Sequence, residues 1–565
     1  MMFASVFSYA EYELKTEWGK ALTAENNNTT QISDIVANDS VIFVSATCMS
    51  MTEEETLRLG GEPVATGTAT TTTSGNAVFV MTCIGKAGDL RWSVYSKGAE
   101  AATNDMYMSP TADGGVVVAF GLRHAKVDPV SDIALVDGKG KETPIEWTVA
   151  NSSSRYYRLV ILKATAWGEI EWLRMAAVDY APVTEKQTVA AQGFGVKSVL
   201  ATAEGDIYVA GRQQKAIKMA TSATDSLEWQ PMFVDGWDGT STSVGGMFIV
   251  KLDAEGYVKK VLQMSGSAKE SNVLEMKESE GAIYAMGTLT FAEETEVKLG
   301  DIAVSYAGEN SLNQAITVAK LSKDLEVEDF WYYPSNISKS VVNYSDMSIA
   351  GDDIYLMGKM MYGMAAEGSE SITTGTLTRD ALVFRVSKKD GSVKGGRAAG
   401  MLQSGYAGIY NGLENTYLFM QTSLGGPYMM EVYGDNNLSE PTAVETLIES
   451  VVDIKGVVEI ETEEGTLLVM AARAANKKNT LYGGEISVGI ESGKNTGVLA
   501  AITLKETAVQ GGDEPENLTA VETLKTVADD AVVYDLTGRY AGKMSEVGQL
   551  KRGLYVAGGR IISVK

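Results

Sequence analysis

The segment Gly205-Asp206-Ile207-Tyr208-Val209-Ala210-Gly211 places a polar turn directly before a short run of β-branched and aromatic residues. A run of this kind between turn residues predicts a β-strand. This arrangement occurs seven times in all, about 50 to 90 residues apart, and a second apolar run follows each one. A repeat this long that is built of strands alone indicates the blades of a β-propeller. The recurring runs comprise residues 41–44, 116–119, 207–210, 283–286, 354–357, 416–419 and 467–470.

These runs are interpreted as the second strands of four-stranded blades. Polar turns such as Lys86-Ala87-Gly88-Asp89 then join third strands to fourth strands as tight hairpins. The seventh unit ends before its fourth strand, but the N-terminal segment 12–18 matches the fourth-strand pattern, including its Trp. The sequence therefore predicts an all-β, seven-bladed β-propeller over residues 11–506 that is closed by an N-terminal strand. The predicted third strands are residues 78–81, 159–162, 248–252, 316–319, 382–385, 428–431 and 499–502.

Composition excludes several classes of partner. The formal charge of −25 and the isoelectric point near 4.6 repel phosphate backbones and anionic lipid, so no nucleic-acid partner is expected. No run of eighteen apolar residues exists, so no membrane span is predicted. Residues 1–10 are interpreted as the remnant of a signal peptide, because Ser8-Tyr9-Ala10 fits a cleavage site, with a disordered end as the alternative. A monomer is expected.

The segments between second and third strands vary in length and share a motif. Leu57-Arg58-Leu59-Gly60-Gly61 resembles residues 297–300 and 481–484, and each precedes a third strand by a similar distance. These inserts are therefore predicted to be β excursions of the repeat that emerge on one face of the ring. They also carry the candidate ligand site, because Trp229 and Trp237 with Asp235 and Asp238 offer aromatic stacking and hydrogen bonding to a sugar. Aromatic packing on the blade rim is the alternative, and the pattern favours it.

Cysteine and histidine usage limits the chemistry. Cys48 and Cys83 fall at opposite ends of neighbouring antiparallel strands, a gap of about 20 Å at about 3.3 Å per residue, so two free, partly buried thiols are expected. The single histidine, His124, excludes a multi-histidine metal site. No phosphate-binding loop, dinucleotide fingerprint or zinc-spaced cysteine pair is present. No catalytic residue, metal or cofactor is therefore predicted.

Two family resemblances can be stated. Residues 205–211 followed by residues 248–256 resemble the bacterial β-propeller repeats of the SBBP type, found in exported proteins. This resemblance covers about residues 11–506, and it implies the fold and an extracytoplasmic setting but no single chemistry.

The C-terminus, from residue 520 to 565, resembles the sorting domain of the type IX (Por) secretion system of Bacteroidetes, after a linker at 507–519. That resemblance implies the secretion machinery as a partner, transport across the outer membrane, and attachment to the cell surface with removal of the tail. The residues that match the sorting signal are Asp535, Gly538, Arg539, Gly553, Tyr555 and Lys565. From its residues alone this tail is a small β module.

Three classes of function follow from the sequence. The first is a secreted or surface-attached propeller that binds a glycan or a protein. The second is a propeller enzyme, a hydrolase or lyase acting on polysaccharide or peptide. The third is a structural surface component. The binding propeller is preferred because export is indicated while catalytic residues are not.

Overall fold

All regular structure in the described part of the chain is β-strand. A computed structural model describes residues 11–24, 29–49, 55–66, 77–97, 100–101, 106–123, 134–145, 158–178, 194–230, 232, 245–266, 268–291, 296–305, 314–334, 343–360, 380–402, 405–413, 415–421, 426–434, 438, 441–475, 478–484, 487–489, 495–507, 532–535, 540–543, 553–557 and 560–564. None of these segments forms a helix that is long and apolar enough to cross a membrane.

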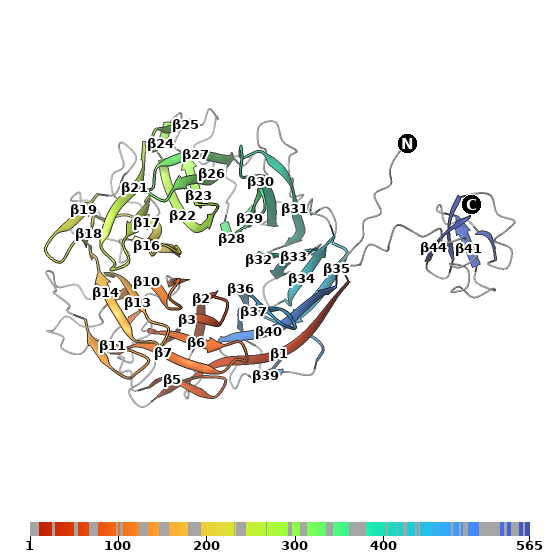
Figure 1. Cartoon of the computed structure of the whole chain (residues 1–565), viewed down its shortest axis with the longest axis horizontal. Helices are drawn as coiled ribbons and strands as arrows, with labels where there is room; N and C mark the ends of the chain where they lie inside the picture. Colours follow the sequence, from red (N-terminus) through yellow and green to blue (C-terminus); the bar gives the residue numbers. More distant parts are fainter. Residues whose placement is uncertain are drawn as a thin grey trace. The chain divides into compact units, whose positions relative to one another are not determined.

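Seven antiparallel sheets form a closed ring of blades within the unit Tyr12–Glu506 (Figure 1). From the axis outward, blade 1 contains β2 (Thr30–Ala37), β3 (Val41–Met49), β6 (Ala77–Gly85) and β7 (Leu90–Lys97). Blade 2 contains β9 (Tyr107–Pro110), β10 (Val116–Arg123), β13 (Arg158–Ala164) and β14 (Ile170–Met175), with the short β8 (Glu100–Ala101) also on β10. Blade 3 contains β16 (Phe194–Ala201), β17 (Ile207–Gln213), β20 (Gly246–Leu252) and β21 (Val258–Gly266).

The remaining blades repeat this order. Blade 4 contains β22 (Ala268–Ser279), β23 (Ala282–Phe291), β26 (Gln314–Ser322) and β27 (Val327–Pro334). Blade 5 contains β28 (Asn343–Ala350), β29 (Asp353–Met360), β30 (Asp380–Ser387) and β31 (Val393–Leu402). Blade 6 contains β32 (Gly405–Asn411), β33 (Thr416–Gln421), β34 (Tyr428–Tyr433) and β35 (Ala443–Ile448). Blade 7 contains β36 (Asp453–Thr462), β37 (Gly465–Ala474), β40 (Thr496–Thr507) and β1 (Glu11–Ala24).

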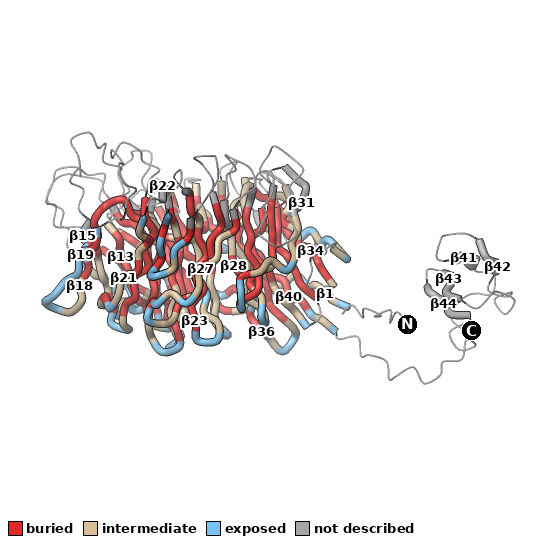
Figure 2. Tube along the Cα trace, turned by 90° about the horizontal axis from the view of Figure 1, so that it is seen from above, coloured by how far each residue is buried: buried red, intermediate tan, exposed pale blue. Residues whose placement is uncertain are grey.

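The core lies between neighbouring blades. Both faces of a middle strand are covered by adjacent sheets, so such strands are continuously apolar, and all seven residues of β20 are buried. One cluster joins Ile42 and Val78 of blade 1 to Val469 and Leu499 of blade 7. Figure 2 shows the strands buried through the body of the ring and exposed mainly at hairpin turns along one face.

The N-terminal strand closes the ring, as predicted. β1 hydrogen-bonds beside β40 as the fourth strand of blade 7, and the hydroxyl of Thr503 donates to Glu17 at 2.8 Å. The end of the same strand pairs with blade 1, with Leu22 opposite Leu59. The first residues of the ring are therefore held by both the last and the first blade.

Insert hairpins extend the sheet of the preceding blade, which sequence analysis did not foresee. The expectation of β excursions is met, but the described hairpins lie against outer strands instead of standing free on one face. The pairs are β4 (Thr56–Leu59) and β5 (Glu62–Thr66) on β1, β11 (Ala134–Val136) and β12 (Glu142–Pro144) on β7, and β24 (Glu296–Leu299) and β25 (Ile302–Ser305) on β21. The hairpin of β18 (Ile217–Ala220) and β19 (Ser226–Trp229) pairs with β15 (Ala177–Val178), in the sheet order β15-β18-β19. A further hairpin consists of β38 (Lys478–Thr480) and β39 (Ser487–Gly489).

Fourth-strand tryptophans link consecutive blades. The indole N–H of Trp92 in blade 1 donates to the carbonyl oxygen of Ala166 in the β13–β14 turn of blade 2, at 2.9 Å. The indole ring of Trp92 covers Gly168 of that turn, and a Cβ added at Gly168 would lie 2.6 Å from the indole. The same contact recurs from Trp18 to Lys86 O and from Trp172 to Ala254 O, each at 2.8 Å.

Both cysteines are free, as expected, and both are fully buried. Cys48 lies opposite Val78 and Cys83 opposite Phe43, so the thiols occupy opposite ends of the β3–β6 pair.

The described C-terminal strands form a sheet of their own, outside the unit Tyr12–Glu506. Its order is β42 (Tyr540–Lys543), β41 (Val532–Asp535), β43 (Gly553–Ala557) and β44 (Arg560–Val564), with antiparallel pairing throughout.

Candidate functional site

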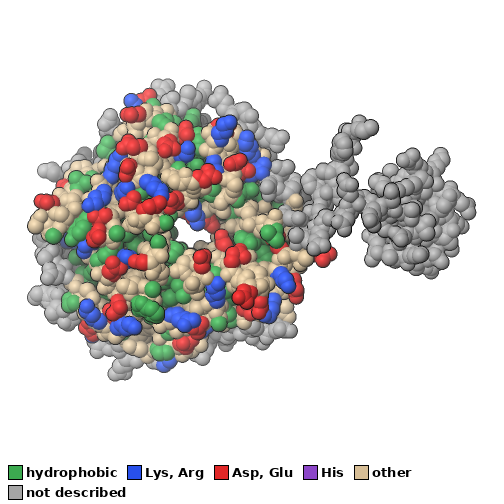
Figure 3. Space-filling view, in the orientation of Figure 1, with side chains coloured by type: hydrophobic (Ala, Val, Ile, Leu, Met, Phe, Trp, Pro, Cys, Tyr) green, Lys and Arg blue, Asp and Glu red, His purple; other side chains and the backbone are tan. Residues whose placement is uncertain are grey.

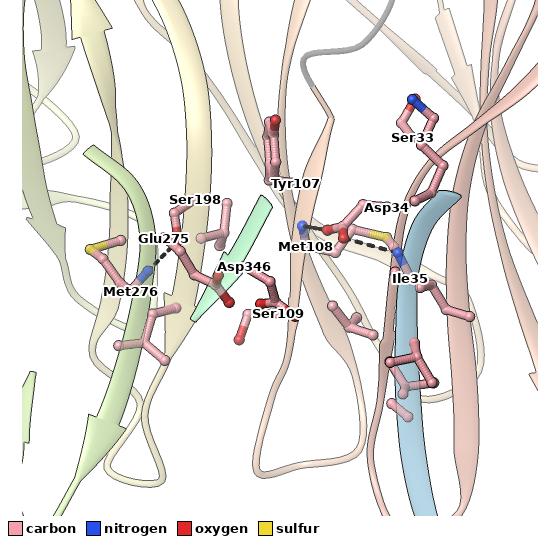
Figure 4. Close-up of a pocket in the computed structure, with 18 of the residues that line it drawn as sticks. Ser33, Asp34, Ile35, Tyr107, Met108, Ser109, Ser198, Glu275, Met276 and Asp346 are labelled. Carbon is pink, nitrogen blue, oxygen red and sulfur yellow. Dashed lines mark hydrogen bonds between the residues drawn. The ribbon is translucent and has the colours of Figure 1, made fainter. Parts of the chain in front are cut away.

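The inner strands of all seven blades enclose an axial channel with a cavity of about 700 Å³. The opening lies at the centre of the ring in Figure 3, and Figure 4 shows its lining. Four carboxylic side chains and three lysines line it, and no group of three or more His, Cys, Asp or Glu in the described residues is placed to hold a metal. These ionisable residues are Asp34, Glu275, Asp346, Glu459, Lys197, Lys277 and Lys455.

A β-bulge at one level of the inner strands directs side chains along the ring. Six inner strands shift register at this level, where an extra residue re-aims the next side chain. We call the residue after the shift the bulge position; in β9, which has no shift, Tyr107 corresponds to it through its pairing with Ala119. The six residues at the bulge position are Asp34, Ser198, Glu275, Asp346, Gly408 and Gly456.

Three bulge-position side chains connect one blade to the next. A carboxylate oxygen of Asp34 accepts the N–H of Met108 at 2.7 Å, and the hydroxyl oxygen of Ser198 accepts the N–H of Met276 at 2.9 Å. These bonds satisfy backbone donors that the channel would otherwise leave unpaired. Glu275 repeats the contact by accepting the N–H of Met347 at 2.6 Å. These channel carboxylates therefore have a structural role.

Glycines take the bulge position in blades 6 and 7, where the next blade approaches closely. An added Cβ on Gly408 would lie 2.4 Å from Val457, and one on Gly456 would lie 3.2 Å from Ile35. In both cases the contact partner is the residue directly after the bulge position of the next blade.

Asp346 departs from this pattern. It accepts the N–H of Met347, its own neighbour, at 2.8 Å and forms a side-chain hydrogen bond with Glu275. None of its hydrogen bonds within the described residues reaches blade 6. Burial, and then the negative charge of Glu275, raise the pKa of Asp346 well above its usual range. The raised pKa favours the protonated form of Asp346, and within the described residues its hydrogen bonds reach another blade only through Glu275 of blade 4.

Lys277 supplies a positive charge beside Glu275 and Asp346. Its ammonium lies 2.9 Å from Oε1 of Glu275, and the negative charge of Glu275 raises the pKa of Lys277 above its ordinary value against the opposing effect of burial. The side chain is 47% exposed although blades surround it, because it faces the open channel. Lys277 therefore presents a charged N–H donor to whatever enters.

Two further channel carboxyls have raised pKa values. Burial raises the pKa of Asp34 to about 7, although the N–H groups of Met108 and Ile35 oppose the shift. Burial likewise raises the pKa of Glu459, opposed by the charge of Lys277. The lining thus combines carboxylic O–H donors, carboxylate acceptors and an ammonium, a set that can hydrogen-bond several hydroxyl groups at once.

The ligand site predicted from sequence is only partly described. Trp229 is 6% exposed, its indole N–H donates to Gln213 at 2.6 Å, and its ring contacts Phe248. This placement agrees with the packing alternative for Trp229. Asp235, Trp237 and Asp238 lie outside the described residues, so the sugar site stays a prediction that depends on them.

The residues of the predicted sorting signal fall partly on the C-terminal sheet. Asp535 on β41 pairs with Tyr555 on β43, and Gly553 pairs with Val564. Gly538, Arg539 and Lys565 lie outside the described residues, as does His124.

Sequence reasoning missed the channel residues. Asp34, Ser198, Glu275 and Asp346 each stand about eight residues before a predicted second strand, and this recurring polar position was the available signal. The inner strands do not alternate cleanly because the bulge interrupts their period of two residues.

Several solved structures are similar to this chain at low identity. They include the quinohemoprotein alcohol dehydrogenase from Comamonas testosteroni (10% identity, 87% of this chain and 76% of that chain, TM-score 0.36) and the polysaccharide lyase Uly1 (10%, 84% and 90%, 0.35). The Dos1 propeller is a third (9%, 61% and 88%, 0.29). At these values the likenesses do not bear on activity. No family model and no curated protein matches the sequence. The fold itself defines the chain as a seven-bladed β-propeller.

Proposed function

We propose that this chain is an exported propeller that binds a polar, uncharged glycan in its axial channel. The supporting observation is Asp346, a partly exposed carboxyl of the channel lining. Among the described residues it accepts no backbone N–H of the next blade, unlike Asp34 and Glu275, and it lies beside Glu275 and Lys277. A polar side chain of the lining that does not hold the next blade is available for ligand contact. The four carboxylic groups and three lysines of the lining largely balance in charge, which favours a neutral ligand. A folded protein does not enter a cavity of about 700 Å³, which favours a glycan over a protein.

Titration calorimetry with neutral oligosaccharides tests the binding. Cellohexaose, xylohexaose and laminarihexaose serve as probes against the full chain and the variants D346N and K277M. We expect at least one probe to bind the wild type, and each variant to bind it about tenfold more weakly, because each loses a carboxylic or charged hydrogen-bonding group. The variant D352N, at an exposed turn outside the channel, is the control and should bind like the wild type. Unchanged affinity in both channel variants would contradict the proposal.

A propeller enzyme is the second candidate, and the carboxyl pair supports it. A carboxylic acid with a raised pKa beside a carboxylate is the arrangement that glycosidic-bond cleavage uses. Glu275 and Asp346 are bonded directly, whereas glycosidases hold their pair about 5 Å or more apart, so binding remains preferred. Product analysis of the same oligosaccharides decides the point. Cleavage by the wild type that D346N abolishes while binding persists would favour the enzyme.

Export through a type IX system completes the proposal. It is supported by the resemblance of residues 520–565 to a sorting tail and by a four-stranded sheet that is separate from the ring unit. A reporter that carries an N-terminal signal peptide and residues 520–565 should appear outside the outer membrane of a competent host. Deletion of residues 553–565 should retain it in the periplasm, because β43 and β44 are lost. Surface display after the deletion would disprove the assignment.

A further inference from the structure

An exposed tryptophan lies on a turn of blade 2, at a position where the matching turns of blades 1 and 3 have no tryptophan. Trp167 in the β13–β14 turn of blade 2 is 70% exposed, and among the described residues it is the only tryptophan that is an exposed large hydrophobic side chain. The matching positions, directly before the turn glycine, hold Ala87 in blade 1 and Glu255 in blade 3. The fold therefore accepts a small or a charged residue here, and packing does not explain the indole.

The turn that carries Trp167 is held rigidly from two sides. Within it, the N–H of Gly168 donates to the carbonyl of Thr165 at 2.9 Å. Trp92 of blade 1 donates to Ala166, and the N–H of Gly138 in the β11–β12 turn donates to the carbonyl of Gly168 at 2.8 Å. A preorganised aromatic side chain loses little conformational entropy when it binds a ligand.

A cavity of about 460 Å³ with a mixed polar and apolar lining adjoins this turn. Ala166 lines it together with the β2–β3 turn and the β9–β10 turn. Asn38 Oδ1 accepts the N–H groups of Ser40 and Val41, so the β2–β3 turn is fixed, and it presents the exposed carboxylate of Asp39. Hydroxyl and amide groups line the cavity as well. Its polar lining residues are Asn38, Asp39, Ser40 and Thr111.

We infer that Trp167 and this cavity form a second binding site, which takes an extended neutral glycan chain. An indole face stacks on the apolar face of a sugar ring, and the cavity offers hydrogen-bonding partners for the hydroxyl groups of the next sugar. One isolated aromatic is too small a patch for a stable protein interface, which buries about 1,200 Å² or more.

Local charge favours a neutral glycan. Asp39 and Glu169 are balanced by the exposed lysines Lys139 and Lys141 on the adjoining turn. The ligand class rests on the proposed function, but the site shares none of the channel residues.

Calorimetry of the full chain with cellohexaose, xylohexaose, laminarihexaose and polygalacturonate tests this site. The variants are W167A, W167Y, and L413A as a matched control, because Leu413 is 73% exposed on a turn of blade 6. We expect one neutral probe to bind W167A at least tenfold more weakly than wild type and L413A, with W167Y in between and thermal unfolding unchanged.

Two results separate this site from the channel. Weaker binding by W167A together with unchanged affinity in D346N supports the Trp167 site alone. Weaker binding by D346N together with unchanged affinity in W167A supports the channel alone. Equal affinity of W167A and wild type, no binding by any neutral probe, or preferential binding of polygalacturonate would each overturn the inference.

Discussion

At the scale of single residues, the bulge position decides how blades 1, 3, 4, 6 and 7 each meet the next blade around the axis. Aspartate, serine and glutamate serve there as acceptors for the next blade, and glycine serves where the next blade comes too close for a side chain. Asp34 is the titratable member of this set with a pKa near neutrality, because burial raises it to about 7. The native state therefore holds that proton more tightly than the unfolded chain, whose aspartates titrate near 3.9.

This shift predicts a pH dependence of stability. A raised aspartate pKa stabilises the folded state most at low pH, and the contribution declines as pH rises from about 4 to about 7. The variant D34S removes the titration and places at this position the residue that blade 3 uses, Ser198. We expect the melting temperature of the wild type minus that of D34S to fall between pH 5 and pH 8, measured by calorimetry. A difference that stays constant over this range would contradict the assigned pKa.

At the scale of elements, blades 7, 1, 2 and 4 are each fastened to the next blade by a tryptophan over a turn glycine. Gly168 has a φ of +81° and lies under Trp92, whereas Gly140 has a φ of +78° with open space beside it. Alanine at either site adds the same backbone strain, of about 1 kcal/mol. Only at Gly168 does it also displace the indole and its bond to Ala166.

The pair G168A and G140A therefore isolates the inter-blade contact. We expect G140A to lower the free energy of unfolding by about 1 kcal/mol, and G168A by about 2 to 4 kcal/mol, because overpacking adds to the strain. Denaturant titration of both variants checks the difference. Equal losses would show that the tryptophan contact contributes nothing.

The second and third strands could be predicted because neighbouring blades bury both faces and make these strands uniformly apolar. The fourth-strand tryptophans were recognised as a pattern, but their turn partners lie about 70 to 80 residues further on, a pairing that local sequence does not encode. The inner strands were not predicted, because they face an open channel and carry a bulge. Asp346 could not be distinguished from other acidic turn and strand residues without the position of Glu275.

At the scale of the whole molecule, closure depends on a strand that is far from its partners in sequence. β1 fills the outer position of blade 7, where Tyr12 donates to Glu445 and Thr16 donates to the carbonyl of Tyr482. Its last residues also receive the β4–β5 hairpin of blade 1. Loss of β1 therefore uncovers the backbone edges of two strands, β40 and β4, and an exposed edge is a template for aggregation.

Deletion of residues 1–22 should accordingly open the ring, while deletion of residues 1–10, which stops short of β1, should not. We expect the longer deletion to aggregate or to melt several degrees below the full chain, since the apolar contacts of Ala21 and Leu22 with blades 6, 7 and 1 are lost with the edge pairing. Scanning calorimetry and light scattering on both deletions provide the comparison. If the two deletions melt within a degree or two of each other and stay monomeric, the ring does not depend on its N-terminal strand, and the seam between blades 7 and 1 must be held by blade packing alone.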